Sequence, residues 1–186
     1  MANWRFYGRT TELDALIDIM RRNRWFFVKI TGRRRIGKTT LVQQAIAARG
    51  STSIVYVQIP DSGDAGVLST FVDALETFGI QREQFPYPRS LAEMSATIEA
   101  LIAAGTIVIL DEFQYFIRAP LADFTSYLQA AVDRLAAQPN RESGGLIVLG
   151  SIHTEMTALL DDRTAPLYNR VTDVLDLVHW DIGSVM

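Results

Sequence analysis

The sequence predicts an α/β protein with three layers, in which helices cover both sides of a parallel five-stranded sheet. Short apolar runs of strand type alternate with longer amphipathic runs of helical type, and parallel sheets with right-handed crossovers are built in this way. The run at 106–110 is apolar throughout, as is typical of a central strand buried on both sides. The chain has 186 residues, 48% of them hydrophobic, which suits one sizeable core. We therefore expect a single domain over residues 1–186.

Periodicity and breaker residues predict the individual elements. In chain order, the predicted helices are 11–22, 40–46, 67–78, 91–104 and 123–137, and the predicted strands are 25–30, 53–59, 106–110, 146–149 and 171–178. Thr11 and Asp14 have the spacing of a capping box for the first helix. Gly50 and Gly79 follow the second and third helices, where glycine commonly ends a helix.

A phosphate-binding loop is the strongest local signal. Residues 31–41 read TGRRRIGKTTL, which contains the spacing G-x-x-x-x-G-K-[ST] between a predicted strand and a predicted helix. Backbone N–H groups of such a loop surround a phosphate at a helix N-terminus, the lysine reaches the β- and γ-phosphates, and the threonine hydroxyl binds Mg²⁺. The expected phosphate-binding residues are Gly32, Arg33, Arg34, Arg35, Ile36, Gly37, Lys38, Thr39 and Thr40.

Two carboxylates follow the apolar strand at 106–110. In an ATP-hydrolysing protein of this type, Asp111 would hold Mg²⁺ together with Thr39, and Glu112 would polarise the attacking water. One predicted strand separates the two motifs in the sequence. This implies an inserted strand and the sheet order 5-1-4-3-2 of the additional-strand ATPase division of P-loop NTPases. A nucleoside kinase would lack the glutamate, and a GTPase would need N-K-x-D, which the sequence lacks; we therefore expect ATP as the nucleotide.

Composition excludes several other classes of protein. The formal net charge is −3, yet residues 1–40 hold ten Arg and Lys against three Asp and Glu, and the remainder holds eight against eighteen. This asymmetry fits a polyanionic nucleotide near the loop and argues against direct nucleic-acid binding. The chain has no cysteine, no apolar run of membrane-spanning length and no signal-like N-terminus, so we expect a cytoplasmic protein without a membrane partner. His153 and His179 have no partner at metal-ligand spacing, and we interpret them as structural.

Five motifs occur in a fixed order along the chain. They are Phe6-x-Gly8-Arg9-x-x-Glu12-Leu13, GRRRIGKT, ILDEFQYF at 109–116, LGS at 149–151 and APLYNR at 165–170. Together they resemble the archaeal-type ATPases, an AAA-like, signal-transduction-type (STAND) group of P-loop proteins with a DEFQ Walker B motif and a PLYGR-like motif.

The resemblance implies roles for further residues. Phe6, Tyr7 and Arg9 would lie beside the adenine, Ser151 would sense the γ-phosphate or the water, and Arg170 would point at the nucleotide. Arg-rich phosphate loops are usual in that family. Asn169 replaces the usual glycine of PLYGR, and asparagine tolerates the same left-handed turn. Family members continue after the fifth strand with a helical lid and a winged-helix domain, which we expect to be absent here.

Simpler interpretations stay open for some of these residues. Arg33, Arg34 and Arg35 could form a solvated loop, Phe6 and Tyr7 could pack on the first helix, and Ser151 could be a turn residue. Three functions fit the sequence: a Mg²⁺-dependent ATPase that is slow in isolation, a nucleotide-gated switch with negligible turnover, and an ATPase that assists DNA transactions. The switch would act by ordering a partner, a second copy or a C-terminal domain.

Overall fold

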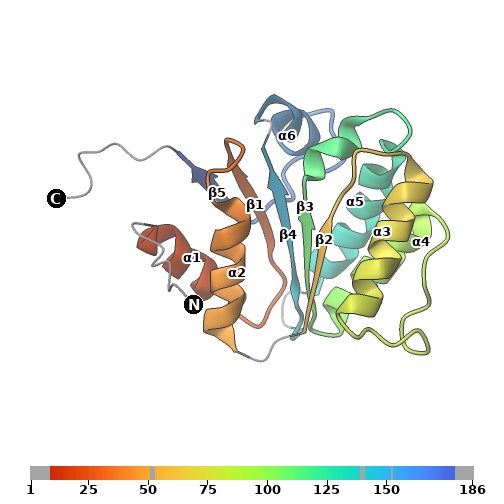
Figure 1. Ribbon diagram of the computed structural model, residues 1–186, viewed down its shortest axis with the longest axis horizontal. Helices are drawn as coiled ribbons and strands as arrows, with labels where there is room; N and C mark the ends of the chain where they lie inside the picture. The colour runs from red at the N-terminus through yellow and green to blue at the C-terminus, as the bar shows by residue number, and fades with distance from the viewer. Residues whose placement is uncertain (1–8, 51–52, 139–140, 152, 179–186) are drawn as a thin grey trace.

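The computed structural model describes residues 9–50, 53–138, 141–151 and 153–178 (Figure 1). Its helices are α1 (Thr10–Met20), α2 (Lys38–Arg49), α3 (Asp64–Thr77), α4 (Leu91–Ala103), α5 (Asp123–Ala136) and α6 (His153–Leu160), with a 3₁₀ helix η1 (Phe113–Ile117). The strands are β1 (Phe27–Gly32), β2 (Ile54–Gln58), β3 (Ile107–Asp111), β4 (Gly145–Gly150) and β5 (Asp173–Leu177). No helix in these ranges is long and apolar enough to span a membrane.

The five strands form one parallel sheet in the order β2-β3-β4-β1-β5. Read from the other edge, this is the predicted order 5-1-4-3-2, which is therefore confirmed. The strands β3 and β4 lie between β2 and β1, so the strand that ends in Asp111 is separated from the phosphate-loop strand by β4 alone.

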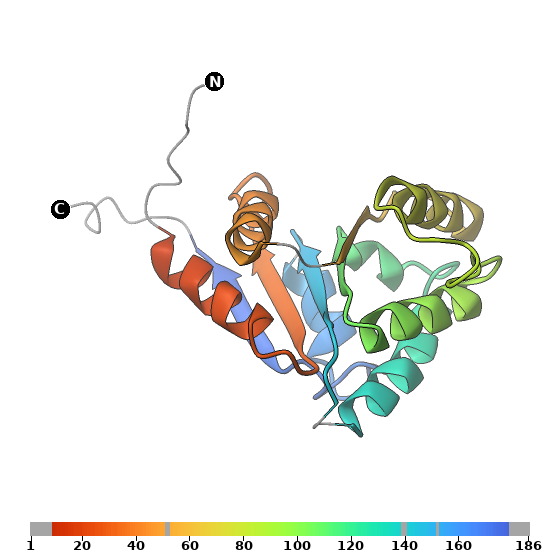
Figure 2. The same cartoon turned by 90° about the horizontal axis from the view of Figure 1, so that it is seen from below.

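Helices cover both faces of the sheet (Figures 1 and 2). The helices α1 and α2 lie on one side, and α3, α4 and α5 lie on the other. Alternate residues of a strand face opposite layers. In β1, Val28 and Ile30 pack with the α1 and α2 cluster, whereas Phe27 packs with the larger cluster on the opposite side. This double burial explains why β1, β3 and β4 are apolar along most of their length.

The capping-box expectation for α1 was wrong. The helix begins at Thr10 with Arg9 as its N-cap and has no side-chain cap, so Thr11 already lies inside the first turn. A capping arrangement occurs instead at α4, where Ser90 Oγ accepts the Glu93 N–H and the Glu93 carboxylate accepts the Arg89 N–H. Neither η1 nor α6 was predicted from the sequence, because both are short.

Candidate functional site

The loop between β1 and α2 folds against the edge strand β5. Gly32 has φ +150°, and a Cβ at this position would lie 2.7 Å from the Leu177 carbonyl oxygen, so only glycine fits there. Gly37 has φ +97° and is the N-cap of α2. Arg35, between them, also has a positive φ of 63°. The loop backbone therefore turns tightly into the helix, with the first N–H groups of α2 at its open side.

Lys38 is folded into this loop. Its side chain is 8% exposed, and Nζ donates hydrogen bonds to the carbonyl oxygens of Gly32 at 2.8 Å and Arg33 at 3.1 Å. Burial lowers the pKa of Lys38, and the nearby carboxylates of Asp111 and Glu112 act in the opposite direction. A buried ammonium beside helix N–H groups favours an anionic ligand, because an anion compensates the desolvated positive charge.

Thr39 and Asp111 join the two motifs. Thr39 Oγ1 donates to Asp111 Oδ2 at 2.9 Å, and Asp111 Oδ1 accepts the Glu112 N–H at 2.8 Å. The second residue that donates to Oδ2 is Tyr56 of β2, which the sequence analysis missed. In the described part of the chain, no cluster of three His, Cys, Asp or Glu forms a metal cage. A hydroxyl with one carboxylate still suits Mg²⁺, which binds through few protein oxygens plus substrate phosphates.

Glu112 lies beside this pair in a left-handed conformation, with φ 56°. Its Oε2 accepts a hydrogen bond from Ser151 Oγ at 3.2 Å and another from Gln114 Nε2. Gln114 is 1% exposed, and its Oε1 has no hydrogen-bond partner among the described residues. The sequence signal for Gln114 was its position two residues after Glu112, while its burial is visible only in the structure. The site thus contains a carboxylate oriented by two polar side chains.

Residues of the phosphate loop line two cavities at the carboxyl ends of the strands. The first has a volume of about 210 Å³ and is lined by Arg34, Arg35, Gly37, Lys38, Thr39, Thr40, Asp111 and Glu112. The second has a volume of about 500 Å³, lies on the β5 side of the loop, and includes Gly32, Arg33, Ile36 and Ser151 in its wall. Arg34 and Arg35 therefore line the 210 Å³ cavity together with the two carboxylates. Arg33 lines the 500 Å³ cavity instead.

Residues 6–179 match the sequence profile of a family described as an ATPase domain predominantly from Archaea. The chain belongs to this family. The match confirms the resemblance that the five motifs indicated, and it covers nearly the whole sequence. No curated protein sequence matches this ATPase domain.

Solved structures share the fold of the ATPase domain at low sequence identity. The Walker-type ATPase PabY2304 of Pyrococcus abyssi superposes with a TM-score of 0.68 at 18% identity, covering 96% of this chain and 55% of that one. The ORC2 protein of Aeropyrum pernix, in ADPNP–ADP complexes, gives 0.59 at 19% identity, with 92% and 48% covered. Cdc6p from Pyrobaculum aerophilum gives 0.58 at 17% identity, with 95% and 47% covered. The chain thus spans about half the length of these structures.

The N-terminal residues expected beside the adenine are only partly described. Phe6 and Tyr7 lie outside the described residues. Arg9 is buried, and its guanidinium donates to Glu12 at 3.3 Å and to the Val178 carbonyl oxygen at 3.0 Å. Arg9 therefore lies where α1 meets the end of β5, on the side of the phosphate loop that adjoins the 500 Å³ cavity.

Arg170 lies away from the phosphate loop of its own chain, and its expected role toward the nucleotide stays a prediction. Its guanidinium donates to both carboxylate oxygens of Asp133 in α5, at 2.7 and 2.9 Å. Thr172, two residues further on, bonds with Phe27 at the beginning of β1. The phosphate loop lies at the other end of β1. Arg170 precedes a strand parallel to β1, so it lies at the end of the strands opposite the phosphate loop.

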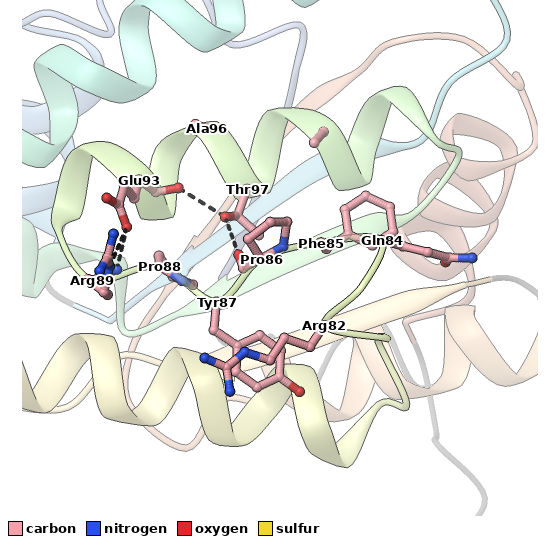
Figure 3. A pocket seen from close by; sticks show the side chains of 11 residues that line it. Arg82, Gln84, Phe85, Pro86, Tyr87, Pro88, Arg89, Glu93, Ala96 and Thr97 are labelled. Carbon is pink, nitrogen blue, oxygen red and sulfur yellow. Dashed lines mark hydrogen bonds and ion pairs between the residues drawn. The ribbon is translucent and has the colours of Figure 1, made fainter.

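A larger groove, of about 610 Å³, lies between α4 and the segment before it (Figure 3). Phe85, Pro86 and Tyr87 form one wall, and Thr97 of α4 forms part of the other. The Arg82 guanidinium lies over the Tyr87 ring, 5.3 Å from its centroid. None of the predicted site residues lines this groove, so size alone does not identify the candidate site.

Proposed function

We propose that this ATPase domain binds ATP with Mg²⁺ and hydrolyses it to ADP and phosphate, slowly in isolation. The observation that carries the proposal is the hydrogen bond of 2.9 Å between Thr39 and Asp111, which brings the phosphate loop and the carboxylate strand to one cavity. The oriented carboxylate of Glu112 lines the same cavity. ATP hydrolysis needs the phosphate loop, the metal-binding carboxylate and the water-activating carboxylate close to one another.

Binding of the triphosphate would rest on positive charge and backbone N–H groups. Lys38 would exchange its hydrogen bonds to the loop carbonyls for bonds to the β- and γ-phosphates. Arg34 and Arg35 are exposed on the wall of the cavity and would add to the positive potential. The structure of the ORC2 protein of Aeropyrum pernix contains ADPNP and ADP, which supports a nucleotide ligand for this fold.

The donor set of Thr39 and Asp111 fits Mg²⁺, since both supply hard oxygen ligands. When bound, the metal ion would neutralise negative charge on the β- and γ-phosphates. Asp111 is 6% exposed and accepts hydrogen bonds at both oxygens, so its carboxylate is held in one orientation before any ligand arrives.

Glu112 would act on the attacking water. Its carboxylate would accept a proton as the water oxygen forms a bond to the γ-phosphorus and the bond from that phosphorus to the β–γ bridging oxygen breaks. Ser151 and Gln114 hold the carboxylate through Oε2, leaving Oε1 for the water. Ser151 also lines the neighbouring cavity, which supports its proposed role in sensing the γ-phosphate.

A nucleotide-gated switch is the second candidate. One observation favours it: Lys38 Nζ donates to two carbonyl oxygens of the loop itself, so these hydrogen bonds must be exchanged before the lysine can bind a phosphate. Because the chain spans about half of its structural neighbours, a further segment could drive that exchange. In that case ATP would change the binding of a partner while turnover stays negligible.

The deciding experiment measures Mg²⁺-dependent ATP hydrolysis and ATP binding for the parent, Lys38→Ala, Glu112→Gln and the control Glu142→Gln, an exposed carboxylate away from the site. We expect Lys38→Ala to bind ATP at least tenfold more weakly. We expect Glu112→Gln to bind normally and to lose about 100-fold or more in turnover, the size of a general-base contribution. Binding without turnover in the parent would favour the switch, and absence of binding would exclude both.

A further inference from the structure

Tyr56 contacts the carboxylate that is expected to hold the metal ion. It lies on the edge strand β2, in register with Ile109 of β3. Its hydroxyl donates to Asp111 Oδ2 at 2.5 Å, the same oxygen that accepts the Thr39 hydroxyl at 2.9 Å. With the Glu112 N–H on Oδ1, each carboxylate oxygen of Asp111 is bound by at least one donor.

The position of Tyr56 is fixed by packing. Its ring is partly buried against the apolar cluster between α2 and the sheet, which includes Leu41 and Ile109. A tyrosine hydroxyl is protonated at neutral pH and donates a hydrogen bond, as it does here to Asp111. A short hydrogen bond to a charged carboxylate from a rigid donor restricts rotation of that carboxylate.

Tyr56 and Thr39 would have different roles in metal binding. Both hydroxyls donate to Asp111, but the Thr39 hydroxyl oxygen is also expected to bind the metal ion directly. The Tyr56 hydroxyl is expected to contact only the carboxylate that binds the metal ion. Partners of this kind orient the groups that bind a metal ion, and their loss weakens metal binding by about 10- to 100-fold.

We propose that Tyr56 is a positioning residue that holds the Asp111 carboxylate in the orientation needed to bind Mg²⁺ with the nucleotide. The inference rests on the proposed function and deepens it by naming a residue on a neighbouring strand that sets metal affinity. Tyr56 does not touch the reacting atoms, so it is not a catalytic residue. A residue with a merely packing role would affect nucleotide binding equally with and without metal.

Tyr56→Phe is a suitable test because it removes the hydroxyl and keeps the ring in the apolar cluster. Binding of fluorescently labelled ADP is measured during a Mg²⁺ titration and again in EDTA. We expect the Mg²⁺ concentration at half-effect to rise about tenfold, with affinity in EDTA unchanged within about twofold. Tyr127→Phe, an exposed tyrosine of α5, is the matched control and should behave as the parent.

A double-mutant cycle with Asp111→Asn makes the test specific. If Tyr56 acts through Asp111, Tyr56→Phe should change the Mg²⁺ dependence by less than about twofold in the Asp111→Asn background. Unchanged Mg²⁺ dependence of the single Tyr56→Phe variant, or an equal loss of affinity with Mg²⁺ and in EDTA, would overturn the inference. If the parent itself fails to bind ADP with Mg²⁺, the proposed function fails and the inference fails with it. Thermal unfolding of each variant shows that the compared proteins are folded.

Discussion

The hydroxyl of Ser151 lies 3.2 Å from Glu112 Oε2, although 39 residues separate the two in the sequence. The contact joins the end of β4 to the end of β3, two neighbouring strands of the sheet. Gln114 binds the same carboxylate oxygen from η1. Glu112 is therefore oriented from two independent elements, as expected for a group that must meet a water molecule in one geometry.

Replacing the buried glutamine should slow catalysis with little effect on binding. Gln114→Leu keeps a similar volume and removes the donor to Glu112, so we expect kcat to fall about tenfold and KM to stay within about threefold, the pattern of lost transition-state positioning. Steady-state kinetics of ATP hydrolysis measures both. Gln138→Leu, at an exposed position after α5, is the control. A loss confined to KM would contradict this role of Gln114.

Two exposed arginines should contribute electrostatically to nucleotide binding. Arg34 and Arg35 line the cavity with Lys38, so we expect the double variant Arg34→Gln, Arg35→Gln to bind ADP about three- to tenfold more weakly at low salt. The difference should shrink toward 1 M salt, where the Debye length is about 3 Å. Isothermal titration at several salt concentrations tests this, with Arg141→Gln as a distant control. A salt-independent difference would indicate a specific contact instead.

The ion pair between Arg170 and Asp133 should support stability and leave nucleotide affinity unchanged. The hydrogen bond from Arg170 lowers the pKa of Asp133 below its ordinary value of 3.8. A carboxylate whose pKa is lower in the folded state stabilises the fold above pH 3.8, and this contribution is lost as the pH falls through the lowered value. We expect Arg170→Gln to lower the free energy of unfolding at pH 7 by about 0.5 kcal/mol, the size of an exposed pair.

Urea unfolding of the parent and Arg170→Gln at several pH values checks this prediction. The difference between the two should vanish in acid, below the lowered pKa of Asp133. ADP affinity of the isolated chain should be equal in both proteins, since Arg170 lies at the end of the strands opposite the phosphate loop. Weaker binding that depends on protein concentration would point to a second copy that receives Arg170.

Gly144, which lies outside the candidate site, tests the close packing of the backbone before β3 and β4. A Cβ at Gly144 would lie 1.8 Å from the carbonyl oxygen of Thr106, so the backbone before β3 must move to accept Gly144→Ala. We expect a loss of at least about 2 kcal/mol in the free energy of unfolding, as for overpacked sites. Gly63→Ala is the matched control, because no atom lies within 4 Å of its Cβ position. Equal stability of the two variants would contradict the described packing.

The sequence was sufficient to predict the sheet order and to place the phosphate loop and Asp111 at the same end of the sheet. The phosphate loop and the pair Asp111 and Glu112 are short local patterns at the ends of strands, so their place follows from strand direction. Tyr56 was not predictable, because its role arises from a hydrogen bond across two strands. The position of Arg170 follows from the same rule of strand direction, since it precedes β5.

The contact between Gly32 and Leu177 has a mechanical consequence. The phosphate loop has no room for a Cβ against β5, and Arg9 binds the carbonyl of Val178 directly after that strand. Displacement of β5 by a fraction of an ångström would thus press on the loop or release it. The edge strand β5 therefore supports the phosphate loop from one side, and the positions of the two segments depend on each other.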